Sequence, residues 1–339
     1  MAANSTEILH DFSPLLRVYK NGRVERLIGT EYAPPSADPA TGVQSKDIKI
    51  APELNVSARL YLPKNANPSR KLPLLVYFHG GGFIVESAFS PLYHQHLNAL
   101  VAEANVVAVS VEYRLAPEHP LPTAYEDSWL ALKWAVSHST GDGDEAWIKD
   151  YADLDHVYLG GDSAGANIAH NVAMRVGSEN LEHINLYGVF LNCPYFWGKE
   201  RIGNEVITIN AFPKNFLDNI WLFARPNTAG LDDPSINPGA DPNLWRFGSK
   251  KVLVYVAEKD IYRERGFHYK EVLDKSGWDG HVEVVEVKGE KHIFSVRYPK
   301  SYNGMAMLKR VASFLNQHKP YNIFNSNDIF PPTFQKSYF

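Results

Sequence analysis

Residues 156–176 read HVYLGGDSAGANIAHNVAMRV, and the fold follows from this stretch. His156–Leu159 predicts a short strand, and Ala164–Val176 predicts a helix. Between them lies Gly161-Asp162-Ser163-Ala164-Gly165, a G-x-S-x-G pattern at a strand-to-helix turn. Such a turn needs small residues two positions before and after the serine, because the backbones come close and the Oγ is left exposed. We therefore predict that Ser163 is a nucleophile at a helix N-terminus, where negative charge is favoured; the alternative is a plain glycine-rich turn.

On both sides of this turn, strand patterns alternate with helical patterns. Short, largely apolar runs predict strands of a largely parallel sheet, buried on both faces; they are Leu72–Phe78, Asn105–Val111, Gly188–Asn192, Lys251–Ala257 and Val282–Val287. Period-2 alternation in Ser57–Leu62 is typical of a half-buried antiparallel strand. The helical patterns are Leu92–Ala104, Ala124–Ser137, Tyr269–Ser276 and Met305–Gln317. The alternation predicts an α/β fold, with a mostly parallel central sheet and helices on both faces.

The chain divides into one long folded region and three distinctive segments. We predict a single α/β domain over residues 1–320, in which residues 1–50 form an N-terminal appendage. Residues about 195–245 are rich in aromatic residues, Pro and Asn, which indicates an insertion that caps a site. Residues 321–339 have no periodicity and are expected to be a C-terminal tail.

Composition excludes several classes of protein. The 339 residues are 45% hydrophobic and 21% charged, with a net charge of −4, which argues against disorder and against nucleic-acid binding. The single cysteine, Cys193, excludes a disulfide framework and a multi-cysteine metal site, and it suits a reducing compartment. Because we see neither a signal-peptide pattern nor an apolar run of about 20 residues, we expect a cytoplasmic protein without a membrane partner.

A second glycine-rich motif follows an earlier strand. His79-Gly80-Gly81-Gly82 comes directly after Leu72–Phe78. Glycines allow backbone N–H groups to approach a ligand oxygen, and acyl transfer needs such donors aimed at the oxyanion of a tetrahedral intermediate. We predict an oxyanion hole made of the amides of Gly81, Gly82 and Ala164. The alternative is a structural turn.

A serine nucleophile also needs a base and an acid that orients the base. Asp260 follows the predicted strand Lys251–Ala257, and His292 follows the predicted strand Val282–Val287. Both fall at the carboxyl ends of strands, the edge where open α/β sheets build their sites. We predict His292 as the base and Asp260 as the acid, with Glu258 as a competitor for the acid role.

These motifs together resemble those of plant carboxylesterases in the hormone-sensitive-lipase-like branch of the α/β-hydrolases. The resemblance spans roughly residues 8–318, and four motifs carry it: His79-Gly80-Gly81-Gly82-Phe83, Tyr113-Arg114-Leu115-Ala116-Pro117-Glu118, Gly160-Gly161-Asp162-Ser163-Ala164-Gly165-Ala166-Asn167 and His292-Ile293-Phe294. Further segments resemble the subgroup of 2-hydroxyisoflavanone dehydratases and carboxylesterase-derived alkaloid cyclases, namely Lys20–Leu27, Thr41–Ile48, Val85–Phe89 and Cys193–Gly198.

The resemblance implies an α/β-hydrolase fold with a helical cap and a serine carboxylesterase activity on small hydrophobic esters. In the resembling dehydratases a threonine stands in the place of Ser163, and in the related gibberellin receptors the histidine is replaced. Here Ser163, Asp260 and His292 are all present. We therefore expect an esterase that needs no metal or cofactor, as a monomer or homodimer. A lyase or cyclase acting on a specialised metabolite is the alternative, and a hormone receptor is a third.

Several residues are expected to surround this site. The segment around Phe12–Leu16 resembles the family's lid. Six residues are expected to line the substrate pocket, although packing within the cap explains its aromatic residues equally well: Phe83, Tyr195, Phe196, Trp197, Trp221 and Ile293. Arg114 and Glu118 are expected to be structural anchors beside the oxyanion loop, and Asp162 is expected to hydrogen-bond local backbone.

Overall fold

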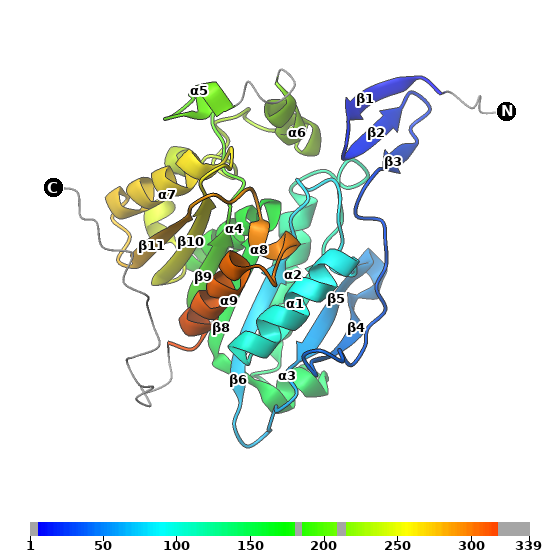
Figure 1. The fold of residues 1–339 in the computed structure, drawn as a ribbon, viewed down its shortest axis with the longest axis vertical. Coiled ribbons are helices and arrows are strands. Elements are labelled where there is room, and N and C mark those ends of the chain that lie inside the picture. Colours follow the sequence, from blue (N-terminus) through cyan, green and yellow to red (C-terminus); the bar gives the residue numbers. More distant parts are fainter. Residues whose placement is uncertain (1–5, 180–184, 209–214, 318–339) are drawn as a thin grey trace.

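The computed structural model describes residues 6–179, 185–208 and 215–317. The predicted C-terminal tail 321–339 therefore lies outside the described residues. Figure 1 shows a central sheet between two layers of helices, with a small separate sheet at the N-terminus. Eight strands form the central sheet in the order β11-β10-β9-β8-β6-β7-β5-β4.

The strands of the central sheet pair mostly in parallel. Their bounds are β4 Gln44–Ala51, β5 Val56–Leu62, β6 Leu72–Phe78, β7 Val107–Glu112, β8 Ala152–Asp162, β9 Leu186–Asn192, β10 Lys251–Ala257 and β11 His281–Val287. From β7 to β11 every neighbouring pair is parallel, whereas β5 runs antiparallel to both β4 and β7. Every residue of β6 is buried, as expected of a strand covered on both faces.

Helices cover both faces of this sheet. The core on one face includes α1 Pro91–Ala104, α8 Phe294–Arg297 and α9 Tyr302–Leu315. The core on the other face includes α2 Thr123–Ser137, α3 Ala146–Tyr151, α4 Ala164–Glu179 and α7 Arg263–Lys275. The predicted fold class is thus confirmed. Helix α7 begins six residues before the predicted Tyr269–Ser276, because its first turn, Arg263-Glu264-Arg265-Gly266, is charged and gives no apolar signal although it is partly buried.

The N-terminal residues form strands that the sequence did not reveal. β1 Ile8–Phe12, β2 Leu16–Tyr19 and β3 Val24–Arg26 pair antiparallel in a three-stranded sheet, shown in dark blue in Figure 1. We call residues 6–26 the N-terminal sheet. Its strands are three to five residues long and β1 is mostly exposed, so neither length nor apolar alternation marks them as strands.

The segment around residues 195–245 contains short helices above the carboxyl ends of the strands (Figure 1). Its helices are α5 Glu205–Thr208 and α6 Phe216–Ala224, followed by the 3₁₀ turns Pro238–Ala240 and Leu244–Arg246. The N-terminal sheet packs against α6, since the Phe12 ring lies 4.8 Å from Phe223 and 6.3 Å from Phe216. The N-terminal sheet and α6, which are distant in sequence, therefore lie together over the same edge of the central sheet.

Candidate active site

Ser163 lies at the sharp turn between β8 and α4. Its φ of 52° is in the left-handed region, which costs energy in a non-glycine residue and is typical of a nucleophile elbow. A Cβ on Gly165 would lie 1.9 Å from the Phe78 carbonyl oxygen, and one on Gly161 would lie 2.4 Å from the backbone of Gly165. The turn thus requires glycine at both positions, as the sequence pattern predicted.

The structure brings the three predicted catalytic side chains into one hydrogen-bonded chain. His292 Nε2 lies 3.0 Å from Ser163 Oγ, and His292 Nδ1 lies 2.7 Å from Asp260 Oδ2. Both distances are within the range of good hydrogen bonds. The chain order Ser163, Asp260, His292 follows the strand order β8, β10, β11, because each residue comes shortly after the carboxyl end of its strand.

Burial separates the two carboxylates that competed for the acid role. The Asp260 side chain is only 1% exposed, and its Oδ1 accepts a hydrogen bond from the Tyr262 amide. Glu258 instead faces outward, where it accepts from the Gly289 amide and pairs with Lys288. These partners lower the pKa of Glu258, first through the Gly289 amide and then through Lys288. Of these two carboxylates, only that of Asp260 is within hydrogen-bond distance of His292.

The amides predicted for the oxyanion hole are available as donors. Gly81 and Gly82 have φ of 105° and 63°, and a Cβ on Gly81 would lie 2.1 Å from the Val85 carbonyl oxygen. Ala164 is the first residue of α4, so its N–H has no acceptor within the helix. Within the part of the chain that the structure describes, none of these three N–H groups donates a hydrogen bond to another protein group. A substrate oxygen could therefore accept from them.

Side chains from distant segments hold this glycine-rich loop. Arg26, at the end of β3, donates to the carbonyl oxygens of Ile84 and Ala116 and pairs with both oxygens of Glu118. Arg114 in turn pairs with the buried Asp127 of α2. Arg114 and Glu118 are thus both ion-paired, and their role as anchors beside the oxyanion loop stays a prediction. Arg26 could not be identified from the sequence, since its partners lie 58 to 92 positions away.

Two of the predicted pocket residues lie in a run of aromatic rings that leads to His292. The Phe83 ring is 6.0 Å from Tyr195, and Tyr195 is 5.0 Å from Tyr262. The Tyr262 ring lies 5.3 Å from the imidazole of His292. Tyr262 was missed by sequence reasoning, although its place two residues after Asp260 was a signal that could have found it. Phe83 also contacts Trp221, at 6.2 Å, so α6 covers the far end of this run.

The other predicted pocket residues have contacts of their own. The Phe196 ring stacks on Tyr269 and meets His170, between α4 and α7. Trp197 donates to Asp218, and Trp221 donates to Gly230, so both indoles have partners within the cap. Ile293 belongs to the core on the α1 and α9 face. The pocket assignment stays a prediction, and Phe212, another aromatic residue of this insertion, lies outside the described residues.

Cys193 lies next to the acid and the histidine. Cys193 is fully buried. Its Sγ, a carboxylate oxygen of Asp260 and a ring nitrogen of His292 all lie within 4.8 Å of one another. Burial, followed by the negative charge of Asp260, raises the pKa of the thiol well above its usual range. This group could hold a metal ion by its distances alone, but an ion there would have to replace the 2.7 Å hydrogen bond between Asp260 and His292.

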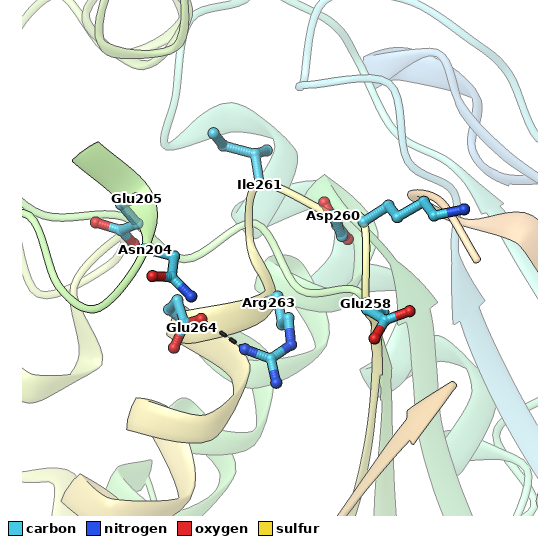
Figure 2. Close-up of a pocket in the computed structure, with 8 residues that line it drawn as sticks. Asn204, Glu205, Glu258, Asp260, Ile261, Arg263 and Glu264 are labelled. Carbon is cyan, nitrogen blue, oxygen red and sulfur yellow. Dashed lines mark hydrogen bonds and ion pairs between the residues drawn. The ribbon is translucent and has the colours of Figure 1, made fainter. Parts of the chain in front are cut away.

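A cavity of about 480 Å³ opens beside α5 and the start of α7. Figure 2 shows the side chains that line it. Its lining is strongly polar and does not include Ser163 or His292: Asn204, Glu205, Glu258, Lys259, Asp260, Ile261, Arg263 and Glu264. Its acids already have partners, since Glu205 pairs with the buried Arg265, and Glu264 pairs with Arg263. This cavity is therefore a poor site for an apolar substrate.

Within the described ranges 6–179, 185–208 and 215–317, no helix is both long and apolar enough to cross a membrane.

The chain belongs to the family of proteins with an alpha/beta hydrolase fold, whose model matches residues 75–296. Two plant proteins are similar over nearly their whole length. A 2-hydroxyisoflavanone dehydratase of Glycyrrhiza echinata is 48% identical over 320 residues, covering 92% of this chain and 97% of that protein. Probable carboxylesterase 13 of Arabidopsis thaliana is 47% identical over 328 residues, covering 93% of this chain and 99% of that protein.

Solved structures of esterases have the same fold. A hyperthermophilic esterase from the archaeon Pyrobaculum calidifontis superposes with a TM-score of 0.68 and is 26% identical, covering 81% of this chain and 85% of that one. A thermostable carboxylesterase from a metagenomic library superposes with a TM-score of 0.69 and is also 26% identical, covering 81% and 88%. The family predicted from the sequence motifs is thus confirmed.

Proposed function

We propose that the protein is a serine carboxylesterase in which Ser163, His292 and Asp260 form the catalytic triad. Ser163 Oγ attacks the ester carbonyl carbon while His292 Nε2, 3.0 Å away, accepts its proton. His292 then donates this proton to the leaving alcohol, and an acyl group remains on Ser163. Water, activated by the same imidazole, releases the acid product. Asp260 holds the imidazole in the required orientation and stabilises its positive charge.

The amides of Gly81, Gly82 and Ala164 stabilise the oxyanion of the tetrahedral intermediate in this proposal. Fixed N–H donors stabilise charge that develops in the transition state, and the loss of one such donor typically costs about a hundredfold or more in rate. The observation that carries the proposal is the unbroken chain from Asp260 through His292 to Ser163. Beside it, in the loop and helix, are three amides that donate to no other group among the described residues.

Small hydrophobic esters are the substrates we propose. The buried rings of Phe83, Tyr195 and Tyr262 form a continuous aromatic cluster from the glycine-rich loop to His292, and sites for apolar ligands are typically lined by aromatic side chains. A net charge of −4 gives little long-range attraction for a strongly charged substrate.

Hydrolysis of p-nitrophenyl butyrate tests this function. We expect Ser163→Ala and His292→Ala each to lower kcat at least about a thousandfold, because the members of a triad act as a unit. Ser276→Ala is a matched control, since the Ser276 hydroxyl donates to the Leu273 carbonyl and accepts from the Trp278 amide, both local bonds at the end of α7. Full turnover by either triad variant would overturn the proposal.

A lyase acting on a specialised metabolite is the second candidate, because the 48% identical relative is named a dehydratase. Incubation with 2-hydroxyisoflavanone, followed by mass spectrometry of the products, separates the two reactions. Loss of water without ester hydrolysis would favour the lyase. Hydrolysis of esters with no loss of water favours the esterase, and fast turnover in either assay argues against a hormone receptor.

The cytoplasmic location and the monomeric or dimeric state belong to this proposal as predictions. Light scattering on the purified full chain measures the oligomeric state, and fractionation of cells that express a tagged full chain measures the location.

A further inference from the structure

A buried carboxylate lies next to the candidate nucleophile without taking part in the triad. Asp162, the last residue of β8, is fully buried, and its two oxygens accept hydrogen bonds from two tyrosine hydroxyls. Tyr77 of β6 donates to Oδ1 at 2.8 Å, and Tyr93 of α1 donates to Oδ2 at 2.8 Å. The expectation that this side chain bonds local backbone is wrong, because among the described residues its oxygens accept from these two hydroxyls and from no backbone amide.

The two tyrosines differ in one respect. The Tyr93 hydroxyl also accepts a hydrogen bond from the Gly80 amide, at 2.7 Å. Within the described residues, the Tyr77 hydroxyl makes no hydrogen bond to the glycine-rich loop 79–83. A continuous path of hydrogen bonds therefore runs from Gly80 through Tyr93 to Asp162, and Asp162 is covalently joined to Ser163.

The fit at Gly80 leaves little room for movement. A Cβ at this position would lie 2.6 Å from Asp162 Oδ2 and 3.0 Å from the Tyr93 hydroxyl oxygen. The loop therefore packs directly on the carboxylate that precedes Ser163. Gly81 and Gly82, which carry the candidate oxyanion donors, follow Gly80 immediately in the chain.

We propose that Asp162 and Tyr93 are positioning residues that fix the distance between the oxyanion-hole amides and Ser163. This inference rests on the proposed esterase function. Oxyanion donors act when they lie about 2.7–3.1 Å from the position of the developing charge, and a displacement of about 1 Å costs much of their effect. Because the loop glycines have no side chains, bonds to the backbone must hold the loop in place.

The ionisation of Asp162 is consistent with this role. Burial raises the pKa of Asp162 from 3.8 to about 6, so the carboxyl is mainly ionised at pH 8. An ionised carboxylate only accepts hydrogen bonds, which directs the Tyr93 proton toward Asp162. The lone pairs of the Tyr93 oxygen then remain free for the Gly80 amide.

Tyr93→Phe and Tyr77→Phe form a matched pair that tests the proposal at pH 8. Each variant removes one phenolic hydroxyl from the same carboxylate, and both rings are buried. With p-nitrophenyl butyrate we expect Tyr93→Phe to lower kcat at least tenfold while KM changes less than threefold. Tyr77→Phe should keep kcat within threefold of the unmodified protein. Affinity for a trifluoromethyl ketone, which forms an oxyanion on the serine, should fall in Tyr93→Phe alone.

Hydrogen–deuterium exchange provides a readout that does not depend on turnover. We expect faster exchange in peptides covering residues 79–85 of Tyr93→Phe, and unchanged exchange there in Tyr77→Phe. Equal effects of the two variants on exchange would overturn the proposal, even in a protein that hydrolyses no ester. Ester hydrolysis by the unmodified protein with equal kcat in both variants would overturn it as well, while leaving the esterase function intact.

Asp162→Asn provides a second test in case Tyr93→Phe does not fold. The amide keeps the volume but has a single acceptor oxygen, so the path to Gly80 is weakened. We expect Asp162→Asn to lower kcat with little change in KM. The double variant Asp162→Asn/Tyr93→Phe should be no slower than the slower of the two single variants, because both changes break the same path of hydrogen bonds. A kcat unchanged in Asp162→Asn would contradict the proposal.

Discussion

Ser163 adopts a backbone conformation that a serine normally avoids, and its neighbours explain how this conformation persists. Its amide donates to the Asn192 carbonyl, and its carbonyl accepts from Tyr195 and Asn167. These bonds come from β9, from the segment after β9 and from α4, so three parts of the fold hold one residue. Strained residues of this kind persist where the surroundings determine them.

The lone cysteine should be chemically inert in the folded protein. Burial and the neighbouring Asp260 raise the pKa of the Cys193 thiol, so almost no thiolate forms at pH 8. We expect iodoacetamide at pH 8 to leave the native protein unlabelled and fully active. The same reagent should add one label in guanidinium chloride, as measured by intact mass. Rapid labelling of the native protein would contradict this description of the site.

The raised pKa of Asp162 predicts how stability depends on pH. Since the pKa is about 6 in the folded protein and 3.8 ordinarily, the carboxyl contributes stability below pH 3.8 that is lost as pH rises through 6. Unfolding of the unmodified protein and of Asp162→Asn, compared at pH 4.5 and 7.5, isolates this contribution. The difference in free energy of unfolding between the unmodified protein and Asp162→Asn should fall from pH 4.5 to pH 7.5, by at most about 3 kcal/mol. If this difference stayed constant or grew with pH, the pKa of Asp162 would not be raised in the folded protein.

At the scale of elements, Arg26 connects the N-terminal sheet to the loop of the candidate oxyanion hole. Its guanidinium contacts two carbonyl oxygens and one carboxylate, a geometry that lysine cannot reproduce. We expect Arg26→Lys to loosen residues 6–26, which chymotrypsin should then cleave faster, and to raise KM for an apolar ester.

Arg23→Lys is the matched control for this change. Arg23 lies in the same small sheet, but among the described residues its guanidinium contacts only Tyr19 and Glu25, both within that sheet. Chymotrypsin should cleave the Arg23→Lys variant at the same rate as the unmodified protein. If both variants were cleaved equally fast, Arg26 would have no special role in holding the sheet.

The elements that the sequence predicted are those with a strong apolar pattern. β10 has the same bounds as predicted, Lys251–Ala257, because all but its first residue are buried. The strands of the N-terminal sheet were not predicted, since they are short and partly exposed, and their partners on α6 lie about 200 positions away. Local pattern cannot reveal a strand that is stabilised by such distant contacts.

At the scale of the whole molecule, the candidate site lies at the carboxyl edge of the sheet, between the start of α4 on one face and the start of α8 on the other. The residues of the candidate triad could be selected from the sequence because chain order and strand ends place them together in this fold. The path through Tyr93 could not, because nothing in the sequence brings α1 beside Gly80. The role of Tyr262 likewise depends on how the turn after Asp260 folds back toward His292.

Labelling with a fluorophosphonate tests the central claim most directly, since this reagent phosphonylates an activated serine. We predict one adduct per chain, located on Ser163 by peptide mass spectrometry, and at least about a hundredfold slower labelling in His292→Ala. An adduct on another residue, no adduct at all, or equally fast labelling without His292 would contradict the claim that Ser163 is a nucleophile activated by His292.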